Sequence, residues 1–248
     1  MKKAVLEAIK AHAQECYPKE SCGLLVSKSR IVSYIPCENT AERADEHFRI
    51  SAEAYAEAEE AGNIIAVVHS HPDASSRPSE ADIASCNVSG LRWHILSWPE
   101  GEMTTIEPDK APVPLIGRAF VHGVQDCASI IIDYYQRELG IDIGQYERED
   151  EWWNKGGNLY LDNLPKAGFY QVDQPMDGDL ILMQIRSPVP NHAAIYLEKG
   201  TLTSEKVHPM PGTILHHLHG RLSGRDVYAG GMFDEKTVSI WRHRDRPA

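Results

Sequence analysis

The first half of the chain alternates between helix-like and strand-like spacing of its apolar residues. The amphipathic pattern over residues 2–16 predicts a helix. The short apolar runs CGLLVS and IVSYIP predict two paired strands, and SAEAYAEAEEAG predicts a helix that ends at Gly62. The strand IIAVVHSH, the helix SEADIASCNVSG, the strand RWHILSW and the hairpin EGEMTTIEP follow. This order, αββαβαββ, predicts an α/β sheet with helices packed on it.

The second half has a different pattern, in which one helix precedes a series of strands. CASIIIDYYQREL predicts a helix that ends at Gly140, and GDLILMQI, HAAIYLEKG, TILHHLHG and VSIWRHR predict a mainly antiparallel sheet. The two patterns meet at EPDKAPVPL, whose three prolines cannot continue a helix or lie inside a sheet. We therefore expect two domains, residues 1–110 with an α/β fold and residues 111–248 with an α+β fold.

Composition narrows the classes of protein to which the chain can belong. With 42% hydrophobic and 25% charged residues, it reads as a globular protein. The net charge of -11 provides no basic surface for phosphates, so we expect no nucleic acid partner. Glu7 and Lys10 interrupt the apolar core that a signal peptide needs, and no apolar run approaches the ~20 residues of a transmembrane helix. We expect neither export by a signal peptide nor membrane insertion.

The segment HSHPDASSRPSEAD, residues 69–82, carries the first candidate site. Side chains two apart on a strand point to the same face, so His69 and His71 can share one metal ion. Asp82, one turn into the next helix, is the natural third ligand, and zinc accepts this set of imidazoles and carboxylate. The alternative is purely structural: Ser79 and Asp82 fit a helix capping box, and the histidines are polar core residues.

The spacing H-x-H-x7-S-x2-D resembles the signature of the JAB/MPN (JAMM) metallopeptidases, and Glu20 in PKESCGLL resembles their upstream acid. The resemblance extends over roughly residues 1 to 107 and implies a JAB/MPN-type fold. It implies that His69, His71 and Asp82 hold Zn²⁺. It also implies that Glu20 transfers the proton of the attacking water, and that Ser79 donates a hydrogen bond to the developing oxyanion.

The second candidate site begins with one of five cysteines, an odd number without CxxC spacing, which argues against disulfides and a structural zinc site. Cys127 lies at the first turn of a predicted helix, where free backbone N–H groups favour a thiolate, and Asp126 is a plausible cap. A small buried apolar residue is the alternative interpretation of Cys127. His192 begins a predicted strand and is a candidate general base, and the later ILHH offers a histidine to orient it.

These segments resemble, in order, those of the NlpC/P60 cysteine peptidases over roughly residues 117 to 243, which implies a papain-like fold. The resemblance implies Cys127 as nucleophile, His192 as base and His216 as the third group, with His217 as the alternative. The chain departs from the family at Ala128-Ser129, where Ser-Gly is usual, and at Phe120, where an aromatic hydroxyl is usual.

The two domains in this order resemble the tail tip assembly proteins of lambda-like phages. The resemblance implies two hydrolase sites, a zinc-dependent peptidase or isopeptidase and a cysteine endopeptidase that cleaves peptidoglycan stem peptides. It also implies other tail tip proteins as partners, and a location in the host cytoplasm during assembly and then at the tail tip. Two alternatives stay open: an assembly factor with weak or latent sites, and a bacterial isopeptidase joined to a wall hydrolase.

Overall fold

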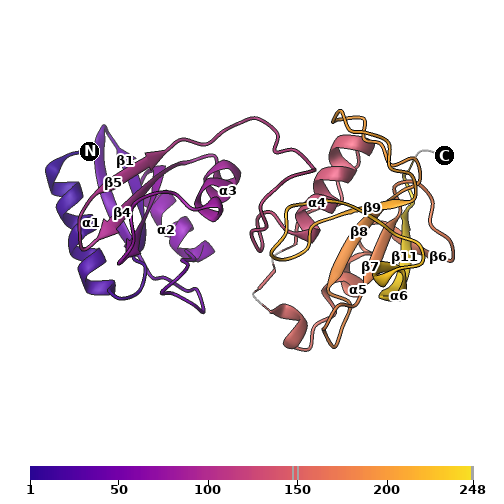
Figure 1. The fold of residues 1–248 in the computed structure, drawn as a ribbon. Coiled ribbons are helices and arrows are strands. Elements are labelled where there is room, and N and C mark those ends of the chain that lie inside the picture. Colours follow the sequence, from indigo (N-terminus) through magenta and orange to yellow (C-terminus); the bar gives the residue numbers. More distant parts are fainter. Residues whose placement is uncertain (147, 150, 247–248) are drawn as a thin grey trace. The chain divides into compact units, whose positions relative to one another are not determined.

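The computed structural model describes residues 1–146, 148–149 and 151–246, and the chain forms two compact units, Met1–Ala111 and Pro112–Ala248 (Figure 1). Each unit has its own sheet, of five strands in the first and six in the second. The two-domain layout predicted from the sequence is therefore confirmed.

The first unit has the predicted order of helices and strands. Its elements are α1 (Lys3–Cys16), β1 (Cys22–Lys28), β2 (Ile31–Cys37), α2 (Ala52–Ala61), β3 (Asn63–Pro72), α3 (Glu80–Ser89), β4 (Arg92–Trp98) and β5 (Met103–Ile106). The strands lie in the order β2-β1-β3-β4-β5, and β3 and β4 are parallel while the other neighbours are antiparallel. The parallel pair is possible because α3 carries the chain back across the sheet.

Helices cover both faces of this sheet (Figure 1). On one face, Ile9 of α1 packs with Leu25 and Val68. On the other, Ala58 of α2 and Cys86 of α3 pack with apolar residues such as Val67. Because strand side chains alternate between faces, His69 belongs to the face that α2 and α3 cover. The predicted metal ligands of β3 and α3 therefore belong to the same layer.

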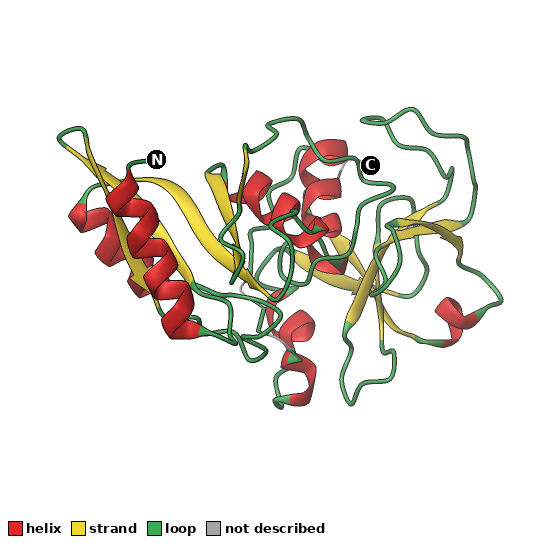
Figure 2. Ribbon diagram, turned by 60° about the vertical axis from the view of Figure 1, so that its left-hand side comes forward, coloured by secondary structure: helices red, strands yellow, loops and turns green. Residues whose placement is uncertain are grey.

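The second unit contains more short elements than the predicted single helix followed by strands. Its elements are α4 (Cys127–Tyr134), a π-helix (Tyr135–Leu139), a 3-10 turn (Trp152–Asn154), α5 (Leu159–Asn163), β6 (Phe169–Val172), β7 (Leu180–Met183), β8 (His192–Leu197), β9 (Thr213–His216), β10 (Gly224–Val227), α6 (Met232–Glu235) and β11 (Thr237–His243). The prediction of only one helix was wrong because α5 and α6 have five and four residues, too few to show a helical period. Figure 2 shows the long loops that join these elements.

The six strands lie in the order β10-β9-β8-β7-β11-β6, with every neighbouring pair antiparallel. Both faces of β7 are buried: Leu180 and Leu182 pack into the same core as α4, and Ile181 and Met183 face Phe233 of α6. The helix runs on through the π-turn to Gly140, whose φ of 68° is the left-handed conformation that ends helices. This core fixes α4, and with it Cys127, against the sheet.

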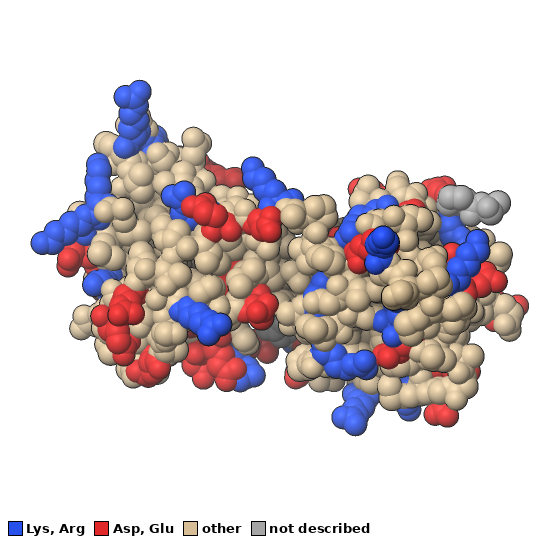
Figure 3. Space-filling model, turned by 45° about the horizontal axis from the view of Figure 1, so that its top comes forward, with Lys and Arg blue, Asp and Glu red and all other residues tan. Residues whose placement is uncertain are grey.

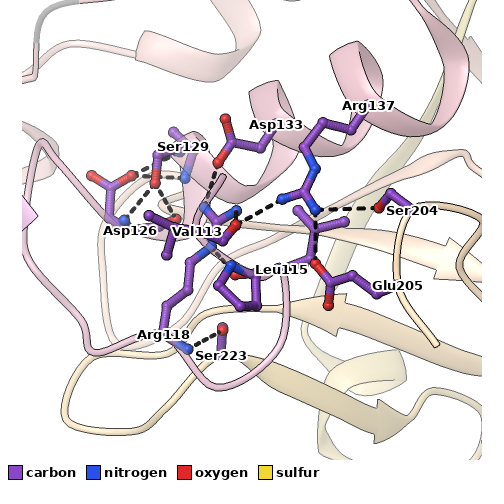
Figure 4. A network of polar contacts seen from close by, with 12 residues as sticks. Val113, Leu115, Arg118, Asp126, Ser129, Asp133, Arg137, Ser204, Glu205 and Ser223 are labelled. Atoms are coloured by element: carbon purple, nitrogen blue, oxygen red, sulfur yellow. Dashed lines mark hydrogen bonds and ion pairs between the residues drawn. The ribbon is translucent and has the colours of Figure 1, made fainter. Parts of the chain in front are cut away.

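The segment that follows Ala111 is held by the second unit (Figure 4). The backbone carbonyl of Val113 accepts hydrogen bonds from Arg118 (3.0 Å) and Arg137 (2.7 Å), and Leu115 N–H donates to the Glu205 carboxylate. Arg118 is 4% exposed and forms a 2.5 Å ion pair with Asp133. From Val113 on, the proline-rich segment is held to the second unit, because the guanidinium groups of Arg118 and Arg137 satisfy its carbonyls.

Charges of both signs are interspersed on the face drawn in Figure 3, where Lys and Arg side chains lie among Asp and Glu side chains on both units. This distribution accords with the net charge of -11. Within the described residues, no helix is both long and apolar enough to cross a membrane.

Candidate functional sites

The first candidate site lies where β3 ends and α3 begins. The register of the antiparallel pair β1–β3 places Cys22 opposite His69, and Ser21 and Ser70 hydrogen-bond beyond it. Continuing this register, Glu20 comes opposite His71, on the same face of the sheet. Asp82 enters the same layer from the first turn of α3. The four residues are thus brought together by strand register and one helix start.

The Nε2 atoms of His69 and His71 and the two carboxylate oxygens of Asp82 form a close cluster, which we call the ligand triangle after its three residues. His69 Nε2 lies 3.1 Å from His71 Nε2 and 3.1 Å from Asp82 Oδ1, and His71 Nε2 lies 3.3 Å from Asp82 Oδ2. Tetrahedral zinc with ligand distances of about 2.0–2.2 Å separates its ligand atoms by roughly 3.3–3.6 Å. One atom from each residue can therefore serve as a zinc ligand with only small adjustments, and a fourth position is left for a water or a substrate atom.

The histidines are prepared for this role by their surroundings. His71 Nδ1 lies 2.9 Å from the Ser75 carbonyl, which can only accept, so Nδ1 carries a proton and Nε2 is the nitrogen left for a metal. His69 is 1% exposed, stacked on Phe48 with ring centroids 4.6 Å apart and bordered by the edge of Trp93. Burial lowers the pKa of His69, which keeps its imidazole neutral and able to bind a metal.

Ser79 and Asp82 form the capping box that the structural interpretation predicts, and the same residues border the ligand triangle. Asp82 N–H donates to Ser79 Oγ (3.1 Å), and Ser79 N–H donates to Asp82 Oδ2 (2.7 Å). The Ser79 hydroxyl also donates to Asp82 Oδ2 at 2.8 Å. Burial opposes ionisation of Asp82, but its close contacts with His69 and His71 outweigh this effect and hold the pKa of Asp82 far below its usual range.

Glu20 is the titratable group of this site with a pKa near neutrality. Glu20 is only 7% exposed, and hydrogen bonds with Ala44 and Asn39 fix its backbone. Burial raises the pKa of Glu20 to about 7, while His71 opposes the rise and Asp82 adds to it. A carboxyl with this pKa can both take and return a proton near pH 7.

The second candidate site begins at the N-terminus of α4. Asp126 caps the helix by accepting from Ala128 N–H and Ser129 N–H, and the Ser129 hydroxyl accepts from Asp126 N–H in return (Figure 4). The buried guanidinium of Arg148 pairs with the Asp126 carboxylate at 3.0 Å. The predicted cap is confirmed, and it orients the first turn of α4 that carries Cys127.

The thiol of Cys127 is held by neighbours that the sequence did not indicate. Its Sγ lies 3.3 Å from the Tyr160 hydroxyl and 4.0 Å from the Asn191 carbonyl oxygen. Burial raises the pKa of Cys127 to about 11, with Asp126 adding to the rise and Tyr160 opposing it. The N–H groups of Ala128 and Ser129 already donate to Asp126, and burial keeps Cys127 a neutral thiol, contrary to the expectation from the helix N-terminus.

His192, His216 and Asp226 form a chain of hydrogen bonds across the sheet. His192 Nε2 lies 3.0 Å from His216 Nδ1, and His216 Nε2 lies 2.9 Å from Asp226 Oδ2. His217 follows on the opposite face and packs edge-on against Phe120, with centroids 5.1 Å apart. Of the two adjacent histidines, His216 is therefore the one that contacts His192.

Among the described residues, no hydrogen bond joins Cys127 Sγ to the His192 ring; the sulfur instead contacts the Asn191 carbonyl next to it. Burial lowers the pKa of His192 to about 3, so both groups are neutral near pH 7. Proton transfer from Cys127 to His192 requires the thiol to turn away from the Asn191 carbonyl.

Two residues of this site were missed by the sequence reasoning, Tyr160 and Asp226. Tyr160 lies on the five-residue helix α5, and Asp226 lies on the four-residue strand β10. The segments NLYLDN and GRDV are too short and too polar for a periodic pattern. The one available signal for Asp226 was its position ten residues after His216, the distance of a tight antiparallel return.

Comparison with known proteins identifies a family for each of the two domains. Residues 2–108 match the family of prokaryotic homologs of the JAB domain, and residues 117–242 match the NlpC/P60 family. The solved structure of a JAB1/MPN domain protein from Archaeoglobus fulgidus is 20% identical, covers 44% of this chain and 87% of its own, and has a TM-score of 0.29.

Two curated relatives span both domains. Tail tip assembly protein K of Escherichia phage N15 is 42% identical over 248 residues, which cover 99% of this chain and 96% of the relative. Tail tip assembly protein K of Escherichia phage lambda is 40% identical over 197 residues, 79% of this chain and 89% of the relative. With both domain families present in the predicted order, the chain belongs to the family of the phage tail tip assembly proteins K.

Proposed function

We propose that this chain acts in phage tail tip assembly and carries two hydrolase sites, a zinc-dependent peptidase or isopeptidase and a cysteine endopeptidase for peptidoglycan stem peptides. The observation that carries the proposal is the triangle of His69, His71 and Asp82, because these residues bring two imidazole nitrogens and a carboxylate within 3.3 Å of one another, the donor set that zinc accepts. The chain is proposed to work with other tail tip proteins, in the host cytoplasm during assembly and then at the tail tip.

In the first domain, His69, His71 and Asp82 would hold Zn²⁺, which would acidify a water and polarise a carbonyl oxygen. Glu20, opposite His71, accepts a proton from the attacking water and returns it to the leaving amine, as its pKa of about 7 allows. The Ser79 hydroxyl stabilises the developing oxyanion. To do so it must release Asp82, to which it now donates at 2.8 Å.

In the second domain, His192 removes the proton of the Cys127 thiol, and the sulfur attacks the carbonyl carbon of an amide. The amide C–N bond breaks, the amine leaves with the proton from His192, and water then hydrolyses the thioester. His216 orients His192 through the 3.0 Å hydrogen bond. Tyr160 presents a hydroxyl 3.3 Å from the sulfur, and burial raises its pKa well above the usual range, so it remains a donor.

Tyr160 supports the proposed cysteine peptidase site because it supplies an aromatic hydroxyl. The family usually has such a hydroxyl in the opening loop, where this chain has Phe120. The Phe120 ring packs edge-on against His217 and His219. The hydroxyl that reaches Cys127 comes from α5 instead. The departure from the family pattern at Phe120 is thereby compensated from another element.

A second candidate function is assembly by a chain whose cysteine site is latent. It is favoured by one observation, the Cys127 thiol that faces the Asn191 carbonyl with a pKa of about 11. A partner in the tail that moves β8 or α5 would then switch the site on. The first site gives no corresponding support to latency, because one candidate ligand atom from each of His69, His71 and Asp82 lies within 4.8 Å of the others.

Complementation tests the role in assembly. The phage that encodes this chain is deleted for it and supplied with wild type, Asp82→Asn, Cys127→Ala or the control Asp173→Asn from a plasmid. We expect wild type and the control to restore infectious particles. Without a plasmid, the deletion phage is expected to form no tails of normal length and infectivity. Full infectivity of the deletion phage without any plasmid contradicts the proposal.

A further inference from the structure

His192, His216 and Asp226 lie on three adjacent strands and on one face of the sheet. In the register of β8 and β9, His216 is directly opposite Ala194, and in that of β9 and β10 it is opposite Gly224. His192 and Asp226 are each two positions from these partners, and residues two apart on a strand share a face. The three side chains are therefore diagonal neighbours, within the reach of long side chains.

The small residues directly opposite His216 make this arrangement possible. Ala194 is fully buried and Gly224 has no side chain, so neither fills the space through which the His216 ring reaches its diagonal neighbours. The ring is further fixed edge-on against Phe233, with centroids 4.7 Å apart. His216 is thus held with one nitrogen toward each of two different partners.

The carboxylate of Asp226, at the end of the chain of hydrogen bonds, determines the direction of each bond. An ionised carboxylate only accepts, so Asp226 requires a proton on His216 Nε2. A neutral His216 then has no proton on Nδ1, which accepts from His192. His192 must therefore carry its proton on Nε2, and its Nδ1 has the lone pair.

We propose that Asp226 is a positioning residue of the cysteine site, which sets the tautomer of His192 through His216 and so leaves Nδ1 of His192 as the base. The proposal rests on the proposed function in one respect: it takes the Cys127 thiol as the group from which Nδ1 of His192 removes a proton. The sulfur lies beside the Asn191 carbonyl and receives the N–H of Ala193, the two residues that flank His192. The nitrogen of His192 that His216 does not occupy is then the one available to the thiol.

The surroundings support a neutral His216 beside an ionised Asp226. Burial lowers the pKa of His216 even though Asp226 opposes the effect. The Arg221 guanidinium, 3.2 Å from Asp226 Oδ2, holds that carboxylate ionised from the solvent side. The pKa of Asp226 is held below its usual value because hydrogen bonding to His216 outweighs the cost of burial.

The ¹⁵N NMR spectrum of histidine-labelled full-length protein at pH 7 tests the proposal without any substrate. His192→Gln and His216→Gln variants assign the two sets of signals. We expect both histidines of the wild type to be neutral Nε2–H tautomers. A His192 protonated on Nδ1, or a His216 protonated on both nitrogens, overturns the proposal even if the protein hydrolyses peptides.

Variants of Asp226 separate positioning from structural support. In Asp226→Asn the amide can donate to His216 Nε2, so we expect Nδ1–H signals to appear for both histidines, and kcat to fall at least about tenfold with KM unchanged. Asp226→Glu restores the carboxylate and is expected to restore the wild-type tautomers. The exposed Asp173→Asn is the matched control. Unchanged tautomers in Asp226→Asn contradict the proposal. If wild type and Asp226→Asn show the expected tautomers but wild type hydrolyses no peptide, only the proposed enzymatic function is contradicted.

Discussion

Asp82→Asn is expected to lose the single zinc ion per chain that wild type binds, with an affinity loss greater than about 100-fold. Loss of residues that only orient a metal ligand already costs about 10- to 100-fold, and Asp82 supplies a ligand atom itself. The amide keeps the shape of the capping residue but removes the charge that both histidines face at 3.1 and 3.3 Å. Elemental analysis after gel filtration, together with competition against a chelator, measures the loss.

The matched control for this variant is Glu80→Gln, an exposed acid in the same first turn of α3 that faces away from the triangle. It is expected to bind zinc as wild type does. Circular dichroism establishes that Asp82→Asn is folded. Stoichiometric zinc in folded Asp82→Asn with wild-type affinity would show that the triangle is a polar cluster of the core and not a metal site.

His192→Gln is expected to reduce release of stem-peptide fragments from purified Escherichia sacculi by about 10²- to 10⁴-fold, the range that a general base contributes. Glutamine has no titratable nitrogen and so cannot take the thiol proton. Its amide can still fill part of the site beside His216. The rate is followed by chromatography of the soluble fragments, and the zinc content of the variant is expected to be unchanged.

His217→Gln is the internal control for His192→Gln, because His217 is equally buried but faces Phe120 on the other side of the strand. We expect it to retain most of the activity, whereas His216→Gln, which breaks the 3.0 Å contact with His192, loses activity. If His217→Gln is inactive and His216→Gln is active, the assignment of the third residue is wrong.

Much of the first domain could be predicted from the sequence, because each of its elements is long enough to show its period. The ten-residue strand β3 places His69 and His71 on one face, and the start signal of α3 places Asp82 one turn into a helix. What the pattern could not decide was whether Ser79 serves the cap or the site. The hydroxyl donates to Asp82 Oδ2 and accepts from Asp82 N–H, so the capping role is confirmed and the role at the site remains a proposal.

The second domain was less predictable because its site depends on short elements and on strand register. Alternation along the chain separates His216 from His217 but does not say which of them faces His192; that depends on the pairing of β8 with β9. Tyr160 and Asp226 lie on elements of five and four residues, below the length at which a period can be recognised. The neutral state of Cys127 depends on burial, which no motif encodes.

The most direct test of two separate hydrolase sites is mass spectrometry of purified peptidoglycan digested with wild type, Cys127→Ala and His69→Ala protein. We expect new stem-peptide fragments with wild type and with His69→Ala, and none with Cys127→Ala. This outcome assigns wall cleavage to the second domain and leaves the zinc site for another substrate. If wild-type protein with one bound zinc per chain releases no fragments, the chain does not cleave stem peptides as isolated, and assembly with a latent cysteine site becomes the better account.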